Sequence, residues 1–428
     1  MTLASKFSDK LLYLFAVSMT LTIFQYHRIP VSLVLLLFYM VLVHGKDINV
    51  KLNRDNIIFL ILGCLSIVST FICLTSEMNN SWKLSGVFNE GIFLILVVYK
   101  LFYSEHMATV KLDIVTKGLK VGCLINLFWC YFQLALYNLT KIDINDLIFH
   151  KTLKLMETAS AYRNGVDYCV TGLGWHPGQL VPIIILLFFM FDSFIIRLLV
   201  LGVCVFSNNS TCLVTGMLCV LGVIAVEMIK GKGNIEGKKI ASSVILLLAL
   251  VVATLIKNDF LLFATDKIAG LFDRLGQVLQ PGEIEDKSTY LHARYYSYYP
   301  NIVEKQNVFE NLFGLGYECS GYPYTKYLDQ FTSLNDWIPE TDYMNFIIGR
   351  GWIWTLLYYF WMLKGSFKAR RVSPFYLLFT LIVMMCGVMY NNQFFWVVIA
   401  EMIMIEAGKQ EKNIWNKPVK LRFPRAGR

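Results

Sequence analysis

Arg163 and His176 lie in a polar stretch, AYRNGVDYCVTGLGWHPGQLVP, that ends where an apolar run begins. Pro177 and Gly178 open that run, and a helix that starts there presents free N–H groups and the positive end of its dipole. An arginine beside such a terminus suits an anion, above all a phosphate. Contact with lipid headgroups or a surface ion pair explains Arg163 equally well, and an interfacial position explains His176.

A second polar stretch, YLHARYYSYYP, holds His292 and Arg294 among five tyrosines. The tyrosines are Tyr290, Tyr295, Tyr296, Tyr298 and Tyr299. Aromatic rings stack on the apolar faces of sugars, and phenol hydroxyls can bond to sugar hydroxyls. An aromatic belt at the membrane surface is the simpler interpretation, but belt residues flank apolar spans. This cluster lies far from both adjoining spans, which favours a ligand-facing or re-entrant helix.

A third stretch, PETDYMNFIIGRGWIW, places Glu340 and Asp342 at the start of an apolar run, where acids commonly cap helices. Arg350 follows about two turns later, and an arginine at that depth is costly unless it is paired or faces water. We predict that Arg350 faces an outer cavity. Gly314 and Gly316, in the preceding FGLGY segment, predict a tight turn or a close backbone approach.

The elements that must position these residues are apolar helices. Of the 428 residues, 56% are hydrophobic and 16% are charged, whereas a soluble chain has about a quarter charged residues. Because a spanning helix needs about 20 mostly apolar residues, we predict an all-α polytopic membrane protein with about twelve spans. The expected spans are 11–26, 29–44, 56–75, 85–103, 112–137, 178–195, 196–207, 209–229, 239–257, 342–363, 374–390 and 392–407. This composition argues against a soluble enzyme, a nucleic-acid binder and a disordered chain.

Lysine and arginine gather in one set of short connections and in the tail 408–428, which predicts that this side and both termini are cytoplasmic. Spans in 1–137, 178–257 and 342–407 then flank two outer loops, a medium loop at 138–177 and a large one at 258–341. The large loop has twelve acidic and six basic residues, so its few arginines are candidates for function. Cys169 and Cys319 lie in these loops, where they either pair in an oxidising compartment or stay as thiols.

The sequence lacks the motifs of several other classes of membrane protein. The sequence has no Walker-type G-x-x-x-x-G-K, no HExxH and no paired CxxC motif, which argues against an ATP-driven pump or a zinc protease. Glu90, Asp192 and Glu401 are the main acids within the expected spans. A structural role for them, paired with neighbouring groups, is favoured over an ion relay.

Taken in order, these segments resemble the bacterial O-antigen and capsule polymerases of the Wzy type and, more distantly, the O-antigen ligases of the same superfamily. Arg163 followed by GWHPGQL is similar to the family's arginine and G-x-x-x-P-N-x-L motif, and SNNSTCLVTG stands in place of its S-x-S-R turn. The outer loop with Arg294 and ENLFGLGY follows, and ETDYMNFIIGRG is similar to the family's return into the membrane. The resemblance covers residues 160–352. Two departures are Thr211 and Cys212 near the place of the turn arginine, and Glu340 where the ligases tend to have histidine, which favours a polymerase.

The resemblance implies a membrane-embedded glycosyltransferase of the GT-C type in the bacterial cytoplasmic (inner) membrane. Its substrates would be two glycans on undecaprenyl diphosphate, and it would join the donor's reducing-end sugar to an acceptor hydroxyl and release undecaprenyl diphosphate. Membrane lipids and a chain-length regulator are further candidate partners. No metal is expected, because arginines can hold a diphosphate. No cofactor is expected, and the basic residues follow the membrane topology and do not indicate nucleic acid.

Roles for the residues follow from that implied reaction. Arg163 and Arg294 are the first candidates for holding the diphosphate, with Arg350 and His176 after them. Glu340 is the first candidate for the base that takes the acceptor's proton, followed by Asp342 and His292. The five tyrosines would line the path of the glycan.

Two other functions stay open. A ligase would transfer the finished O-antigen to a lipid A core in lipopolysaccharide assembly. A repeat-unit flippase would move lipid-linked glycans without making a bond, although the large outer loop argues against it. No feature of the sequence favours a non-enzymatic assembly or sensor protein.

Overall fold

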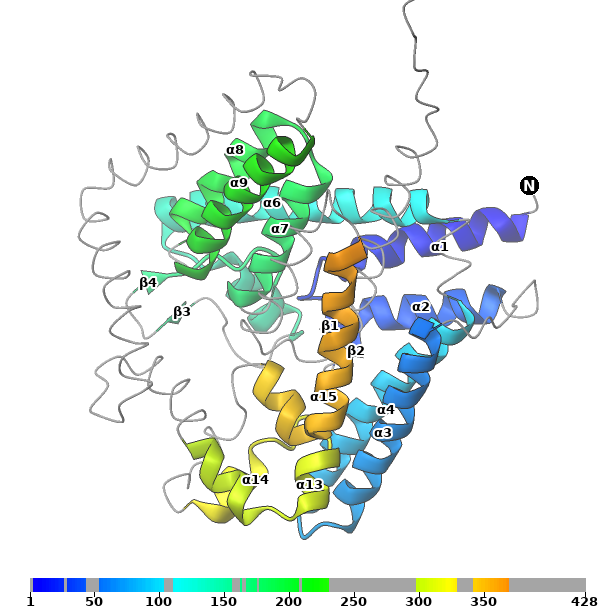
Figure 1. Cartoon of the computed structure of the whole chain (residues 1–428). Helices are drawn as coiled ribbons and strands as arrows, with labels where there is room; N and C mark the ends of the chain where they lie inside the picture. Colours follow the sequence, from blue (N-terminus) through cyan, green and yellow to red (C-terminus); the bar gives the residue numbers. More distant parts are fainter. Residues whose placement is uncertain are drawn as a thin grey trace, which may run out of the picture.

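The computed structural model describes residues 3–26, 29–43, 54–103, 111–155, 162–163, 167–174, 177–207, 210–230, 298–328 and 342–368. Within these ranges the chain is mostly helical, with two small antiparallel hairpins (Figure 1). The long helices are α1 (Leu3–Met19), α2 (Val31–Val43), α3 (Arg54–Thr75), α4 (Asn80–Phe102), α6 (Leu112–Thr140), α7 (Leu180–Met190), α8 (Phe194–Phe206), α9 (Ser210–Lys230) and α15 (Asp342–Lys368). The short helices α13 (Val308–Phe313) and α14 (Tyr322–Tyr327) precede α15.

Each predicted span that falls on described residues contains a helix. However, α7 ends at Met190, short of the predicted end at 195, and α15 is broken at Gly351. The first predicted span is shifted, because α1 already ends at Met19. The following residues form the hairpin of β1 (Gln25–Tyr26) and β2 (Ile29–Pro30). The predicted spans 239–257, 374–390 and 392–407 lie outside the described residues.

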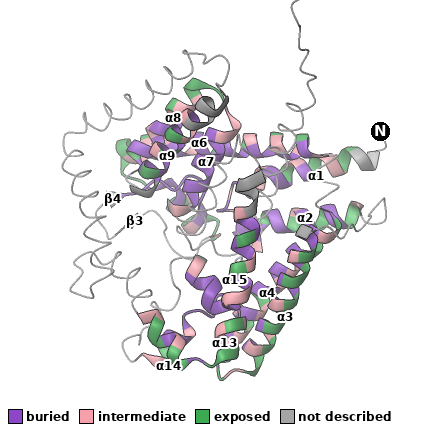
Figure 2. Cartoon of the chain, in the orientation of Figure 1, coloured by how far each residue is buried: buried purple, intermediate pink, exposed green. Residues whose placement is uncertain are grey.

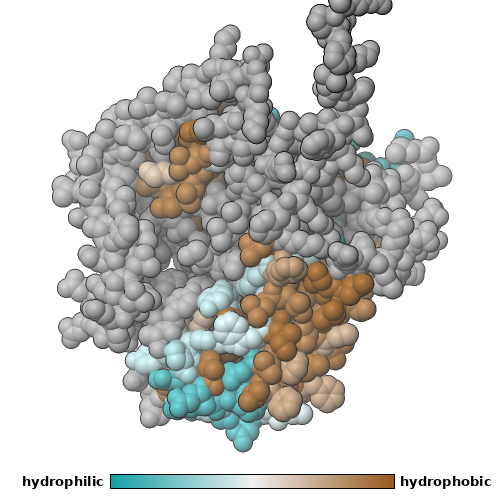
Figure 3. Space-filling view, in the orientation of Figure 1, coloured by the Kyte–Doolittle hydropathy of each residue, from teal (hydrophilic) through white to brown (hydrophobic). Residues whose placement is uncertain are grey.

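Three helical segments in the described part are long and apolar enough to cross a membrane: Asn56–Thr75, Asn80–Phe102 and Leu112–Thr140. Shorter apolar helices are Val31–Val43, Leu180–Met190, Phe194–Phe206 and Cys212–Ile224. Large apolar side chains such as Phe38, Phe71 and Phe128 are exposed on these helices, as expected of side chains that face lipid. Figure 3 shows hydrophobic residues gathered over α3 and α4, with hydrophilic residues at the lower end of the molecule.

Buried faces lie where the helices meet (Figure 2). Helix α1 packs on α6 and α2, and α7 packs on α9 and α6, whereas α3 packs on α4 and α15. Gly118 and Gly122 of α6 allow the close approach of α1. A Cβ on Gly118 would lie 2.6 Å from the Ala16 Cβ, and a Cβ on Gly122 would lie 2.2 Å from the Thr20 Oγ1. Small residues at helix interfaces are the usual means of close packing between membrane helices.

Candidate functional site

Two glycine motifs from separate parts of the sequence meet in the first third of α15. Gly314 and Gly316 have positive φ angles of 82° and 99°, which glycine adopts without steric cost. The amide of Leu315 donates to the carbonyl of Ile348 (3.2 Å), and that of Gly316 donates to the carbonyl of Gly349 (2.7 Å). A Cβ on Gly314 would lie 2.2 Å from the Gly349 oxygen. The close backbone approach predicted from FGLGY is therefore confirmed, and its partner is the IIGRG motif.

Helix α15 breaks where these motifs meet. Gly351 has φ 80° and ψ 168° inside the helix, and a Cβ there would lie 2.3 Å from the Leu312 carbonyl oxygen. The Thr355 hydroxyl donates to the Gly351 carbonyl (2.8 Å). Ser69 of α3 bonds to both motifs, because its hydroxyl donates to the Gly349 carbonyl (2.9 Å) and accepts from the Gly316 amide (2.9 Å). The break in α15 is thus fixed to α3 as well as to the segment before α14.

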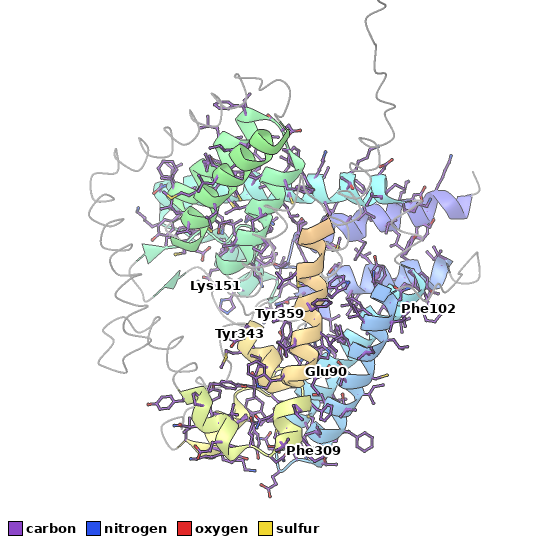
Figure 4. All side chains as sticks on the ribbon, in the orientation of Figure 1. Glu90, Phe102, Lys151, Phe309, Tyr343 and Tyr359 are labelled. Atoms are coloured by element: carbon purple, nitrogen blue, oxygen red, sulfur yellow. The ribbon has the colours of Figure 1, made fainter. Side chains whose placement is uncertain are left out.

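Arg350 of α15 forms an ion pair with Glu90 of α4. Figure 4 shows Glu90 on α4, next to α15. The Arg350 Nε lies 2.9 Å from Oε1 and 3.1 Å from Oε2 of Glu90, and the Tyr317 amide also donates to Oε1 (3.1 Å). Both side chains of the ion pair are 0% exposed. A buried charge needs such a partner and such hydrogen bonds. The expected pairing of Glu90 with a neighbouring basic group is confirmed.

Four aromatic rings surround the guanidinium of Arg350. Its Cζ lies 4.4 Å from the ring centres of Phe93 and Trp354, 4.8 Å from Tyr317 and 5.7 Å from Phe346. Cation–π contacts of this kind add to the ion pair in a desolvated setting. The prediction that Arg350 faces an outer cavity is wrong, because helix α4 and these rings enclose it. Its place among the diphosphate ligands is therefore withdrawn.

Asp192, another acid of the expected spans, does not share the burial of Glu90. Asp192 lies in the turn between α7 and α8, is exposed, and pairs with Arg197, whose Nη2 is 3.0 Å from Oδ1. Glu401 lies outside the described residues.

The end of the tyrosine stretch lies beside the first turns of α15. Tyr298 and Tyr299 begin a helix at 298–305 that packs against the same small core as Tyr343. The ring of Tyr299 lies 6.3 Å from that of Trp352, and burial raises the pKa of its hydroxyl well above the ordinary value, although a hydrogen bond with Trp352 opposes this. Helix α15 begins at Asp342, as predicted. Glu340, His292, Arg294, Tyr290, Tyr295 and Tyr296 lie outside the described residues.

Arg163 belongs to a short hairpin in the segment after α6. Strand β3 (Tyr162–Arg163) pairs antiparallel with β4 (Asp167–Tyr168), and Arg163 lies opposite Asp167. Tyr168 stacks on Tyr137 of α6, with ring centres 3.8 Å apart and planes 6° apart. This contact ties the hairpin to the end of α6.

The segment that follows the hairpin is held by three buried carboxamides. Gln133 accepts from the Gly172 amide (2.8 Å), Asn126 accepts from the Leu173 amide (2.8 Å), and Asn145 donates to the Gly172 carbonyl (2.7 Å). Gly172 has φ 61°. A 3₁₀ helix at Pro177–Gln179 then leads into α7, while His176 lies outside the described residues. Sequence reasoning missed these three carboxamides and their bonds to the backbone of Gly172 and Leu173. The signal in the sequence was the presence of the polar residues Asn126 and Gln133 inside an apolar run.

A charged cluster between α6 and β3 was also missed by sequence reasoning. The π-helix Asp146–Thr152 places the His150 Nδ1 2.7 Å from Oδ1 of Asp146, and the Lys151 Nζ 2.6 Å from Oδ2. Burial raises the pKa of Asp146, but the bonds to Lys151 and His150 outweigh it and hold the pKa below the ordinary value. A carboxylate at Nδ1 orients an imidazole so that Nε2 can exchange a proton, and π-helical turns are frequent at functional sites. The signal in the sequence was the Asp–His spacing of four residues.

Asp143 lies just before this cluster and behaves in the opposite way. Its burial raises the pKa of the carboxyl above the ordinary value, and hydrogen bonds from the Asp146 and Asn145 amides offset only part of the shift. The segment after α6 thus holds two carboxyls whose pKa values are moved in opposite directions, a pattern that is common where proton transfer takes place.

Within the described residues, no group of three or more His, Cys, Asp or Glu side chains is arranged to hold a metal ion. No known protein-family model matches the chain, and no curated protein sequence matches it.

Proposed function

We propose that the protein is a polymerase that joins undecaprenyl-diphosphate-linked repeat units into O-antigen or capsular polysaccharide. The observation that carries the proposal is the meeting of FGLGY with IIGRG, two segments on which the family resemblance rests. Their junction places the helix 298–305, which begins with the last two tyrosines of the stretch, beside the helix that starts at Asp342. Tyr298 and Tyr299, which could contact a glycan, and the carboxylate of Asp342, which could act as an acid or base, then lie in the same region.

In this proposal the chain has about twelve spans and a GT-C architecture, with both termini in the cytoplasm. Helix α3 follows Lys51 and Arg54 and runs outward, and α6 follows Lys111 and also runs outward. The π-helix with His150, the hairpin with Arg163, the segment 298–328 and the start of α15 then share the outer face.

The proposed reaction breaks the bond between the donor's anomeric carbon and its diphosphate oxygen, while an acceptor hydroxyl oxygen bonds to that carbon. Arg163 and Arg294, with His176, stabilise the charge that grows on the departing diphosphate. The hydroxyl proton passes to a base, for which the candidates are Glu340, Asp342, His292 and, from the geometry of the π-helix, His150. Arg350 acts in this proposal by holding the broken helix α15 to α4.

Deletion of the gene tests the proposal. A polymerase mutant should carry surface glycan with a single repeat on its anchor. A ligase mutant would instead accumulate polymer on undecaprenyl diphosphate with none on lipid A core, and unchanged chain-length ladders would rule out the polymerase. Polymerisation of lipid-linked units by the purified protein in detergent would exclude a flippase.

A further inference from the structure

Cys73 and Cys319 bring together two distant parts of the chain. Cys73 lies near the end of α3, and Cys319 lies in the turn between α13 and α14. Both are fully buried in a small core that also contains Met78, Trp82 and Leu315. Cys169, the partner considered for Cys319 on sequence alone, lies elsewhere, beside β4. The cysteine that lies next to Cys319 in the tertiary structure is therefore Cys73 and not Cys169.

The two sulfurs occupy one small space above α4. The Cys319 Sγ lies 3.2 Å from the Trp82 carbonyl oxygen and the Cys73 Sγ lies 3.8 Å from that of Lys83, one residue further along the helix. A Cβ on Gly86 would lie 2.8 Å from the Cys73 sulfur and 3.0 Å from the Cys319 sulfur. Gly86, with no side chain, leaves the room that both sulfurs use.

We propose that Cys73 and Cys319 are the reduced form of a structural disulfide that links α3 to the turn between α13 and α14. The inference rests on the outward orientation in the proposed function, because disulfides persist on the oxidising side of a membrane. The two thiols exchange with the disulfide of an oxidant, such as a thiol oxidoreductase or oxidised glutathione. The Cys73–Cys319 bond forms as the disulfide bond of the oxidant breaks, and the two sulfurs of the oxidant take up the two cysteine protons and become thiols.

The bond would reinforce the junction around Arg350. Gly316, which bonds to Ser69 and Gly349, lies three residues before Cys319, and a Cβ on it would lie 3.2 Å from the Cys73 sulfur. A cross-link here fixes the FGLGY segment to α3 and closes a long loop of the unfolded chain. In the chain-entropy account, longer closed loops give larger stabilisation.

Peptide mapping of the full-length protein tests the proposal. Membranes are prepared without reductant and with an alkylating reagent present from lysis, and the protein is digested and analysed by mass spectrometry. We expect a linked peptide pair that contains Cys73 and Cys319 and that disappears after reduction. Cys64→Ser, at an exposed cysteine of the same helix, should keep the link, and Cys73→Ser and Cys319→Ser should each lose it.

Quantitative alkylation of both cysteines in the wild-type chain, also after refolding in oxidised glutathione, would overturn the disulfide. The peptide map of the wild-type protein shows whether the disulfide is present, even if a serine variant does not accumulate. The readout is independent of glycan synthesis. If the linked peptide is found and the deletion strain has normal glycan ladders, the disulfide is supported and the polymerase is rejected. If the peptides are not linked and the deletion strain has lost its glycan ladders, only the disulfide is rejected.

Discussion

The Arg350 guanidinium and the Glu90 carboxylate form a fully buried ion pair between α15 and α4, with Nε 2.9 Å from Oε1. Such a pair adds little net stability compared with apolar residues, but the loss of one partner leaves an uncompensated buried charge. Because Arg350 follows directly on the glycine that bonds to the FGLGY segment, the pair also fixes how the broken helix sits against its neighbours. This relationship leads to the first prediction.

Glu90→Gln should destabilise the protein by about 3–5 kcal/mol, because Arg350 stays charged and buried without its carboxylate. The measurement is the thermal unfolding midpoint of the purified protein in detergent. Glu90→Leu combined with Arg350→Met should lose much less, because both charges leave together. Glu77→Gln is the matched control, since Glu77 and Lys326 form an exposed pair that should contribute little. Equal losses in the single and double variants would contradict the prediction.

Gly314→Ala should be destabilising because the added Cβ would lie 2.2 Å from the Gly349 oxygen, at a φ of 82° that alanine rarely adopts. We expect a lower unfolding midpoint and lower abundance in the membrane. Gly91→Ala, in α4, is the control, because a Cβ there would meet nothing within 4 Å beyond the backbone of its own helix and alanine favours a helix by up to about 1 kcal/mol. A Gly314 variant as stable as the Gly91 variant would mean that the two motifs are not joined.

Asp146 and Asp143 should give opposite pH dependences of stability. The folded pKa of Asp146 is lowered, so its contribution is present above the unfolded value of about 3.9 and is lost as the pH falls through the folded pKa. The folded pKa of Asp143 is raised, so its contribution is present below the unfolded value and is lost as the pH rises through the folded pKa. Unfolding midpoints of Asp146→Asn and Asp143→Asn between about pH 3 and pH 7 measure both effects.

At neutral pH, Asp146→Asn should therefore be less stable than the wild type, and Asp143→Asn should be as stable or more stable. Two variants that shift in the same direction across this range would show that the two carboxyls do not differ as described.

Arg294→Ala should abolish polymer formation with normal protein abundance, because the departing diphosphate loses a cationic ligand. Lysine at this position should rescue poorly, since it lacks the planar fork that binds two phosphate oxygens. The measurement is the ladder of chain lengths in a complemented deletion strain, with immunoblotting for abundance. Normal ladders with Arg294→Ala would remove this residue from the site.

His150→Gln should lower the polymerisation rate by about 10²–10⁴-fold if the imidazole takes the acceptor's proton. Lys151→Gln is the control, because Lys151 bonds to the same carboxylate but is largely exposed. An unchanged rate in His150→Gln would leave the base among Glu340, Asp342 and His292.

The sequence by itself determined the helices and some of the local geometry. Apolar runs of the required length marked the helices, since a run of about 20 apolar residues is a property of adjacent positions. The end of α1 was misplaced because the residues from 20 to 26 are as apolar as the helix before them but fold into a turn and strand. Gly314 and Gly316 predicted a close approach between two backbone segments, because glycine is the residue that fits a positive φ at a crowded site.

Only the tertiary structure decided which partners meet. Arg350 and Glu90 are separated by 260 positions, and no periodicity links them, so the sequence could not tell a paired arginine from one that faces water. The same holds for Cys73 beside Cys319 and for Asn126 and Gln133 around Gly172. These pairings follow from the packing of helices against one another, and packing depends on the shapes of whole faces rather than on the order of neighbouring residues.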